Sequence, residues 1–290
     1  MKQLLILSGK GGTGKTTVAA AFIKLSACKA YADCDVDAPN LHLIINSSVL
    51  PISKPFWGMP KYKIDSTQCL GCGKCYQVCR FDAIHQFSLG FVIDPIACEG
   101  CATCALVCPI QCIKETPHHV GNLMLYKSQT LFSTAKLNPG GGNSGLLVTE
   151  VKKQLRQEST ADFEIIDGSP GIGCPVIASM NNADLLLLMT EPSLSGLSDL
   201  DRVAITAEKL HIPTVVCINK VEVYSAIIDE IIDYCHKKNI PMIGIIPYDK
   251  TVPKNINLGI SIIDTDSIAK KSIIEIFTKV KQILYETKER

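Results

Sequence analysis

The sequence predicts an α/β fold, in which a mostly parallel, doubly wound sheet carries a smaller inserted α+β domain. Three observations support this prediction. The chain opens with an apolar segment, a glycine-rich turn and a helical segment. Near-continuous apolar runs recur along the second half, as in parallel strands that are covered on both faces. Two similar cysteine runs interrupt this pattern between residues 69 and 108.

The first element is an apolar strand over residues 3–8, followed by a glycine-rich loop and a helix from Thr17. The loop reads G-x-x-x-x-G-K-T from Gly9 to Thr16, which in this strand–loop–helix context is the P-loop of nucleoside triphosphatases. Its backbone N–H groups and the helix N-terminus suit phosphate oxygens. Lys15 is expected to reach the β- and γ-phosphates, and Thr16 to bind Mg²⁺. The loop residues expected to bind ATP or ADP are Gly11, Gly12, Thr13, Gly14, Lys15, Thr16 and Thr17.

Lys10 is a second lysine inside this loop. The string K-G-G-T-G-K-T-T resembles the deviant Walker A motif of the MinD/ParA/Mrp superfamily, to which the nitrogenase iron protein is related. The resemblance implies an ATP-dependent homodimer in which Lys10 reaches the phosphates of the partner subunit. There it would supply the positive charge that an arginine finger gives elsewhere. A solvated loop lysine is the alternative.

An acidic loop follows the expected second strand, which ends near Asp33. Carboxylates at the carboxyl end of a parallel strand lie beside the ligand crevice of an open sheet. The string D-x-D-x-D-x-P-N-L resembles the Walker A′ segment of MinD-like ATPases. That resemblance implies that Asp35 orients the attacking water, that Asp33 supports Mg²⁺ or its water shell, and that Asn40 shapes a switch loop. An acidic turn without a catalytic part is the alternative, above all for Asp37.

Fourteen cysteines in 290 residues are more than an ordinary cytosolic enzyme needs. Because a P-loop uses cytosolic nucleotide, metal binding explains these cysteines better than disulfides do. Prolines and glycines between residues 49 and 60 precede them, and this composition predicts a linker or strap rather than a regular element.

Eight of the cysteines form two runs of the bacterial ferredoxin pattern C-x2-C-x2-C-x3-C, the first beginning at Cys69 and the second at Cys98. In that pattern the fourth cysteine of each run binds the cluster of the other run. Runs of this form do not match the paired hooks of zinc sites. Cys112 lies outside the pattern and is expected to be a packed thiol rather than a ligand. We expect two [4Fe–4S] clusters, one on Cys69, Cys72, Cys75 and Cys108, the other on Cys98, Cys101, Cys104 and Cys79.

A second catalytic segment begins with the apolar strand 163–167. It ends in Asp167, as a Walker B strand does, and this carboxylate is expected to hold Mg²⁺ through water. The glycine- and proline-rich loop behind it suits a switch that responds to the γ-phosphate. Cys174 in this loop resembles the switch II cysteine of the nitrogenase iron protein. Because no second interface cysteine is evident, we expect a buried thiol near the dimer face rather than a cluster ligand.

The rest of the chain continues the α/β alternation. Strands are expected at 184–190, 213–220 and 242–249, and helices at 146–157, 197–210, 227–238 and 272–284. The glycine-rich loop 138–145 is expected to be a lid or a docking loop. By resemblance to the MinD class, Asn219 at a strand end is expected to read the adenine amine. The apolar stripe of the last helix is expected to pack on the core rather than on a membrane.

The whole chain resembles MinD-superfamily P-loop ATPases that contain an inserted two-cluster ferredoxin domain. The ATPase parts are expected at 1–54 and 119–290, and the insertion at 55–118. A net charge of +1 gives no bulk attraction to nucleic acid or anionic lipid. No apolar run is long enough to predict a membrane-spanning helix, so a cytoplasmic protein is expected.

The expected function is a MinD-type ATPase that couples ATP binding and hydrolysis to the redox state or electron transfer of its two clusters. It would act on an acceptor or partner protein that the sequence does not name. One alternative is a regulatory or positioning ATPase whose ferredoxin domain senses redox state or docks a partner. Another is an ATPase for cluster assembly or transport, although the C-terminal C-x-x-C of Mrp-type carriers does not occur after residue 217.

Overall fold

The computed structural model describes residues 2–45 and 49–286. The chain divides into two compact units. The first comprises Met1–Lys54, Leu123–Lys136 and Ser144–Arg290, and the second Pro55–Asn122 and Leu137–Asn143. The second unit thus extends beyond the expected end of the insertion at residue 118, since Asn138 N donates to Val120 O at 2.8 Å and brings the later segment back to it. Residues 1 and 287–290 of the expected ATPase ranges lie outside the described residues.

A mostly parallel sheet organises the fold. In the described residues it has nine strands in the order β13-β12-β11-β1-β10-β2-β9-β8-β3. The ladders from β13 to β9 are parallel, and the short turn 128–130 makes β8 antiparallel to β9. The strands are β1 (Lys2–Ser8), β2 (Ala30–Asp33), β3 (Ile52–Trp57), β8 (His119–Lys127), β9 (Leu131–Leu137), β10 (Phe163–Asp167), β11 (Leu185–Thr190), β12 (Thr214–Val221) and β13 (Met242–Pro247).

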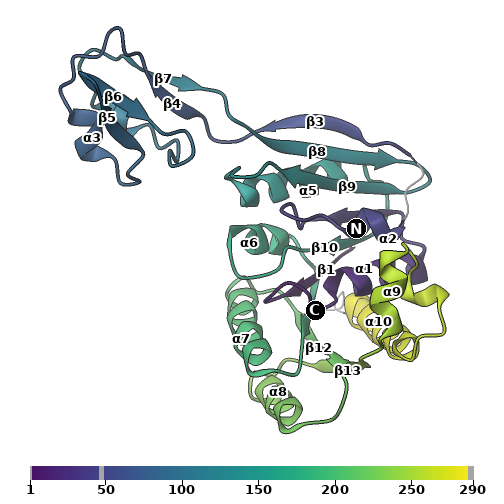
Figure 1. The fold of residues 1–290 in the computed structure, drawn as a ribbon. Helices are drawn as coiled ribbons and strands as arrows, with labels where there is room; N and C mark the ends of the chain where they lie inside the picture. The colour runs from purple at the N-terminus through teal and green to yellow at the C-terminus, as the bar shows by residue number, and fades with distance from the viewer. Residues whose placement is uncertain (1, 46–48, 287–290) are drawn as a thin grey trace. The chain divides into compact units, whose positions relative to one another are not determined.

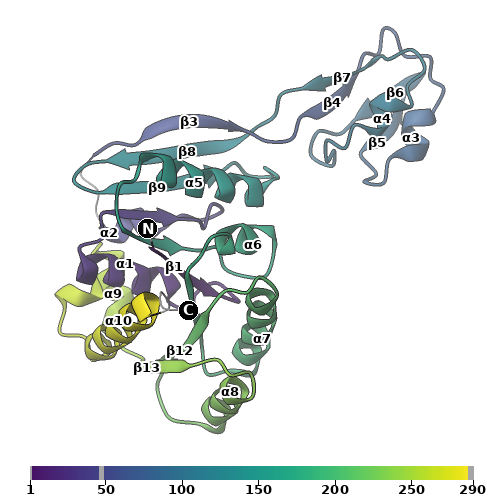
Figure 2. The same cartoon turned by 180° about the vertical axis from the view of Figure 1, so that it is seen from behind.

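Helices cover both faces of this sheet, as expected of a doubly wound fold. Figures 1 and 2 show α1, α2, α9 and α10 along one face and α5 to α8 along the other. None of the described helices is both long and apolar enough to cross a lipid bilayer. Their bounds are α1 (Lys15–Ser26), α2 (Leu41–Ile45), α5 (Ser144–Glu158), α6 (Cys174–Met180), α7 (Leu194–Lys209), α8 (Ala226–Lys237), α9 (Thr251–Asn257), the 3-10 turn η1 (Ile262–Asp264) and α10 (Ala269–Glu286).

The core lies between the sheet and these helices. The residues of β1 from Leu4 to Leu7 and of β11 from Leu185 to Leu188 are all at most 1% exposed, which is why they read as unbroken apolar runs. The apolar stripe of α10, including Phe277 and Val280, packs into the same core. The expectation that the last helix packs on the core is confirmed.

The segment expected to be a linker or strap is strand β3 at the edge of the sheet. An edge strand leaves one row of backbone groups unpaired, so it tolerates Pro55, which has no N–H to donate. The proline therefore indicates an edge position here and not the absence of a strand.

The second unit repeats one pattern twice, with the same offset that separates Cys69 from Cys98. The first copy is β4 (Lys61–Ile64), α3 (Lys74–Val78) and β5 (Ile84–Phe87), and the second is β6 (Gly90–Ile93), α4 (Thr103–Leu106) and β7 (Ile113–Thr116). β4 pairs with β7 and β5 with β6, so each small sheet takes one strand from each copy. Residues with positive φ also recur at this offset: Gly71 and Gly100, Gly73 and Ala102, Asp82 and Gln111. The two copies are interleaved halves of one unit.

Candidate nucleotide-binding site and cysteine clusters

The glycine-rich loop lies where β1 ends and α1 begins. Gly14 precedes the helix with φ 88°, and a Cβ there would lie 2.3 Å from Asn219 Nδ2, so the position requires glycine. Among the described residues no side chain caps α1. The first backbone N–H groups of this 12-residue helix are therefore left for a ligand, and an anion suits them best.

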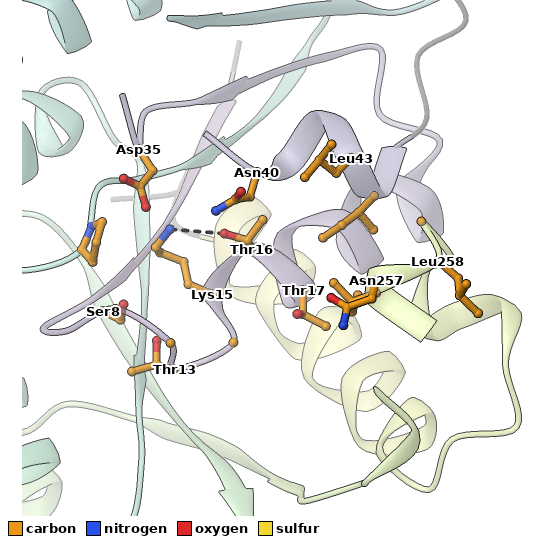
Figure 3. Close-up of a pocket in the computed structure, with 17 residues that line it drawn as sticks. Ser8, Thr13, Lys15, Thr16, Thr17, Asp35, Asn40, Leu43, Asn257 and Leu258 are labelled. Carbon is orange, nitrogen blue, oxygen red and sulfur yellow. Dashed lines mark hydrogen bonds between the residues drawn. The ribbon is translucent and has the colours of Figure 1, made fainter. Parts of the chain in front are cut away.

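This loop forms one wall of a cavity of about 640 Å³. Figure 3 shows Lys15 and Thr16 close together, with Asp35 and Asn40 beyond them and Asn257 on the other side. The loops after β1 and β2 and the end of α9 thus meet around one cavity. Such a crevice at the carboxyl ends of parallel strands is where this class of fold binds ligands.

Lys15 and Asp167 form a buried ion pair in this region. Lys15 Nζ lies 2.9 Å from Asp167 Oδ1, and the two side chains are 6% and 0% exposed. Burial opposes the charge on Lys15, but the carboxylates of Asp167, Asp33 and Asp35 outweigh it and raise the lysine pKa. The lysine is therefore held charged at the place where phosphates are expected.

The second carboxylate oxygen of Asp167 is available to a ligand. Its Oδ2 is buried and has no hydrogen-bond partner within the described part of the chain. Leaving such an oxygen unpaired costs free energy, which a ligand or bound water would recover. Thr16 Oγ1 lies 3.5 Å from Lys15 Nζ, which places a hydroxyl beside the same lysine. These oxygen atoms fit Mg²⁺, which takes oxygen ligands and keeps several of its own waters.

Asp33 is fully buried, and its carboxylate accepts hydrogen bonds from the backbone of the acidic loop. Its Oδ1 accepts a hydrogen bond from Asp35 N, and its Oδ2 accepts from Asn40 N and Leu41 N, each at 3.0 Å. Burial, followed by the nearby carboxylate of Asp167, raises the pKa of Asp33 to about 7. Three backbone donors thus already use its oxygens, a role that the sequence did not reveal, and its part in a Mg²⁺ shell stays a prediction.

Asp35 is the carboxylate of this loop that lines the cavity, together with Asn40. Burial raises the pKa of Asp35, partly offset by the charge of Lys15. Asp37, in contrast, is exposed. The three aspartates of the motif therefore differ in place: one folds the loop, one faces the cavity and one faces solvent.

A second cavity of about 280 Å³ shares Gly12, Gly14 and Thr17 with the first. Its lining is mostly apolar and includes Pro247 and Tyr248, which suits a flat aromatic base. The expected contact of Asn219 with adenine stays a prediction, because its side chain supports the phosphate loop in this structure. Asn219 Nδ2 donates to Thr13 O at 2.7 Å, and its Oδ1 accepts from Lys220 N at 2.9 Å.

Helix α9 is a part of the site that the sequence analysis missed. Ile256 and Asn257 line both cavities. Asp249 Oδ1 accepts hydrogen bonds from Thr251 N at 2.8 Å and Thr251 Oγ1 at 2.7 Å just before this helix. An aspartate turn followed by Pro253 in the first helical turn is the sequence signal that could have found it.

Lys10 is held by an ion pair and a hydrogen bond within its own chain. Its Nζ lies 3.1 Å from Glu191 Oε2 and 3.4 Å from Ser195 Oγ. Lys220 Nζ lies 2.8 Å from Glu191 Oε1 and also donates to Gly12 O. Burial would raise the pKa of Glu191, but the two lysines outweigh it and the pKa lies below its usual range. Neither a role for Glu191 nor one for Lys220 was predicted from the sequence.

Cys174 is exposed, so the expectation of a buried thiol was wrong. It is the first residue of α6 and directly follows a glycine-rich loop, which leaves its side chain in solvent. The neighbouring Ile172 and Ile177 are also about half exposed.

The four thiols expected to bind one cluster line a single small cavity in the second unit. Cys112 lines it too, with its Sγ 3.6 Å from Cys108 Sγ. The repeat offset makes Cys112 the counterpart of Ala83, and both are buried, at 3% and 2% exposed. This position belongs to the core in both copies, as expected for a packed thiol. The four expected ligands in the cavity are Cys69, Cys72, Cys75 and Cys108.

The other four expected ligands belong to the second copy and to Cys79. Burial and the nearby Cys98 and Cys101 raise the pKa of Cys104 to about 11, so these three thiols are neighbours. Cys79 packs on the same core. In the described ranges no group of three or more His, Cys, Asp or Glu side chains is arranged to hold a metal ion. Both ligand sets stay predictions, and the shared position of Cys69, Cys72, Cys75 and Cys108 on one small cavity is compatible with the first of them.

Comparison with known proteins identifies the family. The sequence profile of the CobQ/CobB/MinD/ParA nucleotide binding domain matches residues 4–262. The chain belongs to this family. Its MinD and ParA members are P-loop ATPases. The matched range contains the phosphate loop, Asp167 and the strands that end at the two cavities.

Relatives of this MinD/ParA-family chain include archaeal proteins of similar length. It is 32% identical to an uncharacterized protein of Methanocaldococcus jannaschii, over 97% of both chains. It is 23% identical to the iron-sulfur cluster carrier protein of Pyrococcus horikoshii, over 99% of this chain and 88% of that one. The septum site-determining protein MinD of Pyrococcus horikoshii, solved with Mg-ADP, has a TM-score of 0.59 at 18% identity, over 100% of this chain and 99% of that one. This structural likeness shows the α/β fold with its mostly parallel sheet.

Proposed function

We propose that this MinD/ParA-family protein is a dimeric, cytoplasmic ATPase that couples ATP binding and hydrolysis to the redox state or electron transfer of two [4Fe–4S] clusters. It would act on a partner protein. The buried ion pair between Lys15 and Asp167 carries this proposal, because it joins the expected phosphate ligand to the expected switch aspartate. The cavity that the four expected ligands of the first cluster line in the same chain supports that cluster.

Nucleotide binding would exchange the partners of Lys15. The β- and γ-phosphates would compete with Asp167 for the ammonium group of Lys15. The uncapped N–H groups at the start of α1 would favour the phosphates. Thr16 and, through water, Asp167 would hold Mg²⁺, with Asp33 beneath them. Asp167 directly precedes the loop 168–173. Its release from Lys15 would therefore be the local event that moves this switch loop.

Hydrolysis would require two further residues. Asp35 lines the cavity and would orient the attacking water, and its raised pKa makes it a better proton acceptor than an ordinary aspartate. Lys10 would come from the partner subunit and stabilise the charge on the transferred phosphoryl group. In each subunit the ATPase site would therefore be complete only in the dimer.

The cysteine sets would each hold one cluster through four thiolates, Cys69, Cys72, Cys75 and Cys108 for one and Cys98, Cys101, Cys104 and Cys79 for the other. A [4Fe–4S] cluster supplies a one-electron couple whose potential depends on its surroundings and exposure. Cys72 and Cys101 are exposed and Cys75 and Cys104 are buried, so each set has one side toward solvent. That side would be the one that a partner protein contacts.

Anaerobic redox titration of the cluster-loaded protein tests the proposal. Titrations would be run without nucleotide, with ADP, with ATP and with a non-hydrolysable ATP analogue. We expect the potential of at least one cluster to differ between the nucleotide-free and ATP states. The matched variant Asp35→Asn should keep this difference and lose turnover. Equal potentials in all states, together with no ATP-dependent electron release to a dye, would exclude redox coupling.

A second candidate is an ATPase that carries iron–sulfur clusters as cargo. It is supported by the likeness to the Pyrococcus horikoshii protein of that name and by the exposed Cys72 and Cys101. Mixing the loaded protein with an apo-ferredoxin distinguishes the two. Complete ATP-dependent loss of iron to the acceptor would favour the carrier, whereas retained iron with a nucleotide-dependent potential would favour redox coupling.

A further inference from the structure

We propose that Glu191 is a positioning residue that retains Lys10 inside its own subunit, and that Lys10 must leave Glu191 before it can reach the phosphates of a partner subunit. This inference rests on the proposed function, which gives Lys10 its role in the dimer. It assigns Glu191 a part in the timing of dimer formation.

The order of the strands places three charged side chains together. β1, β11 and β12 are neighbours in the parallel sheet, with β11 in the middle. Lys10 follows β1, Glu191 follows β11 and Lys220 lies near the end of β12. Because the carboxyl ends of parallel strands share one edge of the sheet, the carboxylate lies between the two lysines.

Each lysine uses a different oxygen of Glu191. Lys10 Nζ lies 3.1 Å from Oε2, and Lys220 Nζ lies 2.8 Å from Oε1. The side chains of Lys10 and Glu191 are 34% and 21% exposed. The pair is thus partly shielded from water, so its attraction exceeds that of a fully exposed pair, yet Lys10 can still leave it.

Lys220 makes the release of Lys10 less costly. Its backbone has φ 60°, which is uncommon for a lysine, and its side chain contacts both Glu191 and Gly12 O. When Lys10 leaves, Glu191 therefore keeps one ammonium partner and is not left as an unpaired charge. Lys220 is the permanent partner in this triad, and Lys10 is the exchangeable one.

Close packing holds the main chain on the N-terminal side of Lys10 in place. A Cβ on Gly9 would lie 2.4 Å from Asp199 Cβ, because the start of the loop packs directly on α7. Close packing at this residue fixes the main chain next to Lys10. The exchange between Glu191 and a partner subunit is then a swing of the lysine side chain alone.

Removal of the carboxylate should release Lys10 and favour the dimer. From the usual strength of partly exposed ion pairs, we expect an effect of about threefold for each subunit. Because a dimer uses two copies of Lys10, the effect on the dissociation constant of the ATP-bound dimer should be about tenfold.

The test compares Glu191→Gln with the parent in the cluster-loaded protein. Sedimentation with a non-hydrolysable ATP analogue gives the dimer dissociation constant, and turnover measured against protein concentration gives its kinetic counterpart. We expect the dimer dissociation constant and the protein concentration at half-maximal turnover each to fall about tenfold. The control Glu158→Gln removes a remote surface pair, Lys127–Glu158 at 2.7 Å, and should change neither. Glu191→Asp, which keeps the charge, should stay near the parent. Unchanged or weakened dimerisation in a folded Glu191→Gln protein would overturn the inference.

The same substitutions in a Lys10→Ala background separate this inference from the proposed function. If Glu191 acts by retaining Lys10, Glu191→Gln should have no effect on dimerisation once Lys10 is gone. If Lys10→Ala alone leaves dimerisation and turnover unchanged, the proposed role of Lys10 fails. If Lys10→Ala abolishes turnover but Glu191→Gln does not tighten the dimer, only the inference about Glu191 fails.

Discussion

Lys15 Nζ lies 2.9 Å from Asp167 Oδ1 at a place where neither side chain is more than 6% exposed. The pair joins the first residue of α1 to the last residue of β10. The strands β1 and β10 are paired neighbours, with Ile6 opposite Asp167. The expected ligand of the phosphates is therefore also the partner of the expected switch residue. Binding of a phosphate at Lys15 and release of Asp167 are two sides of one exchange.

The first prediction concerns the stability of the nucleotide-free protein. Lys15→Met should lower its free energy of unfolding by about 3 kcal/mol, because the substitution leaves the charge of Asp167 buried without a partner. Adding Asp167→Asn removes that charge, so the double variant should recover at least half of the loss. Urea unfolding of the four proteins measures this cycle. Strictly additive losses would show that the two side chains are not coupled.

The second prediction concerns pH and the loop before α9. Hydrogen bonds to Asp249 from Ser267 Oγ at 2.6 Å, from Thr251, and from Ile268 N at 3.0 Å hold its pKa at about 2. A carboxyl whose pKa is lower in the folded state contributes stability above its unfolded value of 3.8, and this contribution is lost as pH falls toward 2.

Asp249→Asn should therefore be less stable than the parent by about 1 kcal/mol at pH 7, a value that allows for the exposure of the group. The difference should shrink as the pH falls from about 4 towards 2. Denaturant unfolding over a series of pH values measures it. A difference that stays constant down to pH 3 would show that the charge of Asp249 is not what stabilises this loop.

Local patterns predicted most of the first unit and the parts of the site that lie on it. The strand, the glycine loop and the helix that follow one another from Lys2 to Ser26 carry their own signals, and so does the apolar strand that ends in Asp167. These elements are specified by neighbouring residues, through glycine conformation and apolar runs. The cysteine repeat predicted a separate insertion at 55–118, and the interleaving of its two halves became visible only in the pairing of β4 with β7 and of β5 with β6.

Long-range pairing accounts for what the sequence did not show. Glu191 is far from Lys10 along the chain, and only the order of β1, β11 and β12 brings the two together. Likewise, β3 is a strand because the sheet offers it an edge, whereas the prolines and glycines between residues 49 and 60 suggested a linker. The equivalence of Cys112 and Ala83 needs the register of both copies, although the repeat offset was already visible in the cysteine spacing.

The third prediction compares two neighbouring cysteines. Cys108→Ser should remove one ligand of the first expected cluster, so the purified protein should contain about four irons rather than about eight. Cys112→Ser, 3.6 Å away, should keep the full iron content, since Cys112 occupies the core position that Ala83 fills in the other copy. Iron and sulfide analysis after anaerobic reconstitution gives both numbers. The reverse result would make Cys112 the fourth ligand.

The last prediction separates nucleotide binding from hydrolysis. Lys10 contacts Glu191 and Ser195 and is not among the described residues that line the phosphate cavity of its own subunit. Lys10→Ala should therefore leave the dissociation constant for ADP within about threefold of the parent. Its turnover should fall by at least about a hundredfold, as happens when a positive charge that stabilises the transition state of phosphoryl transfer is removed.

Lys15→Ala is the matched control, because Lys15 lines the cavity itself and its loss should weaken ADP binding as well as turnover. Fluorescent-nucleotide titration and phosphate release measure the two properties separately. Sizing in the presence of an ATP analogue should show the parent shifting toward the dimer and Lys10→Ala remaining smaller. Turnover that persists in Lys10→Ala would mean that each subunit completes hydrolysis with its own residues, and the partner would then have no catalytic role.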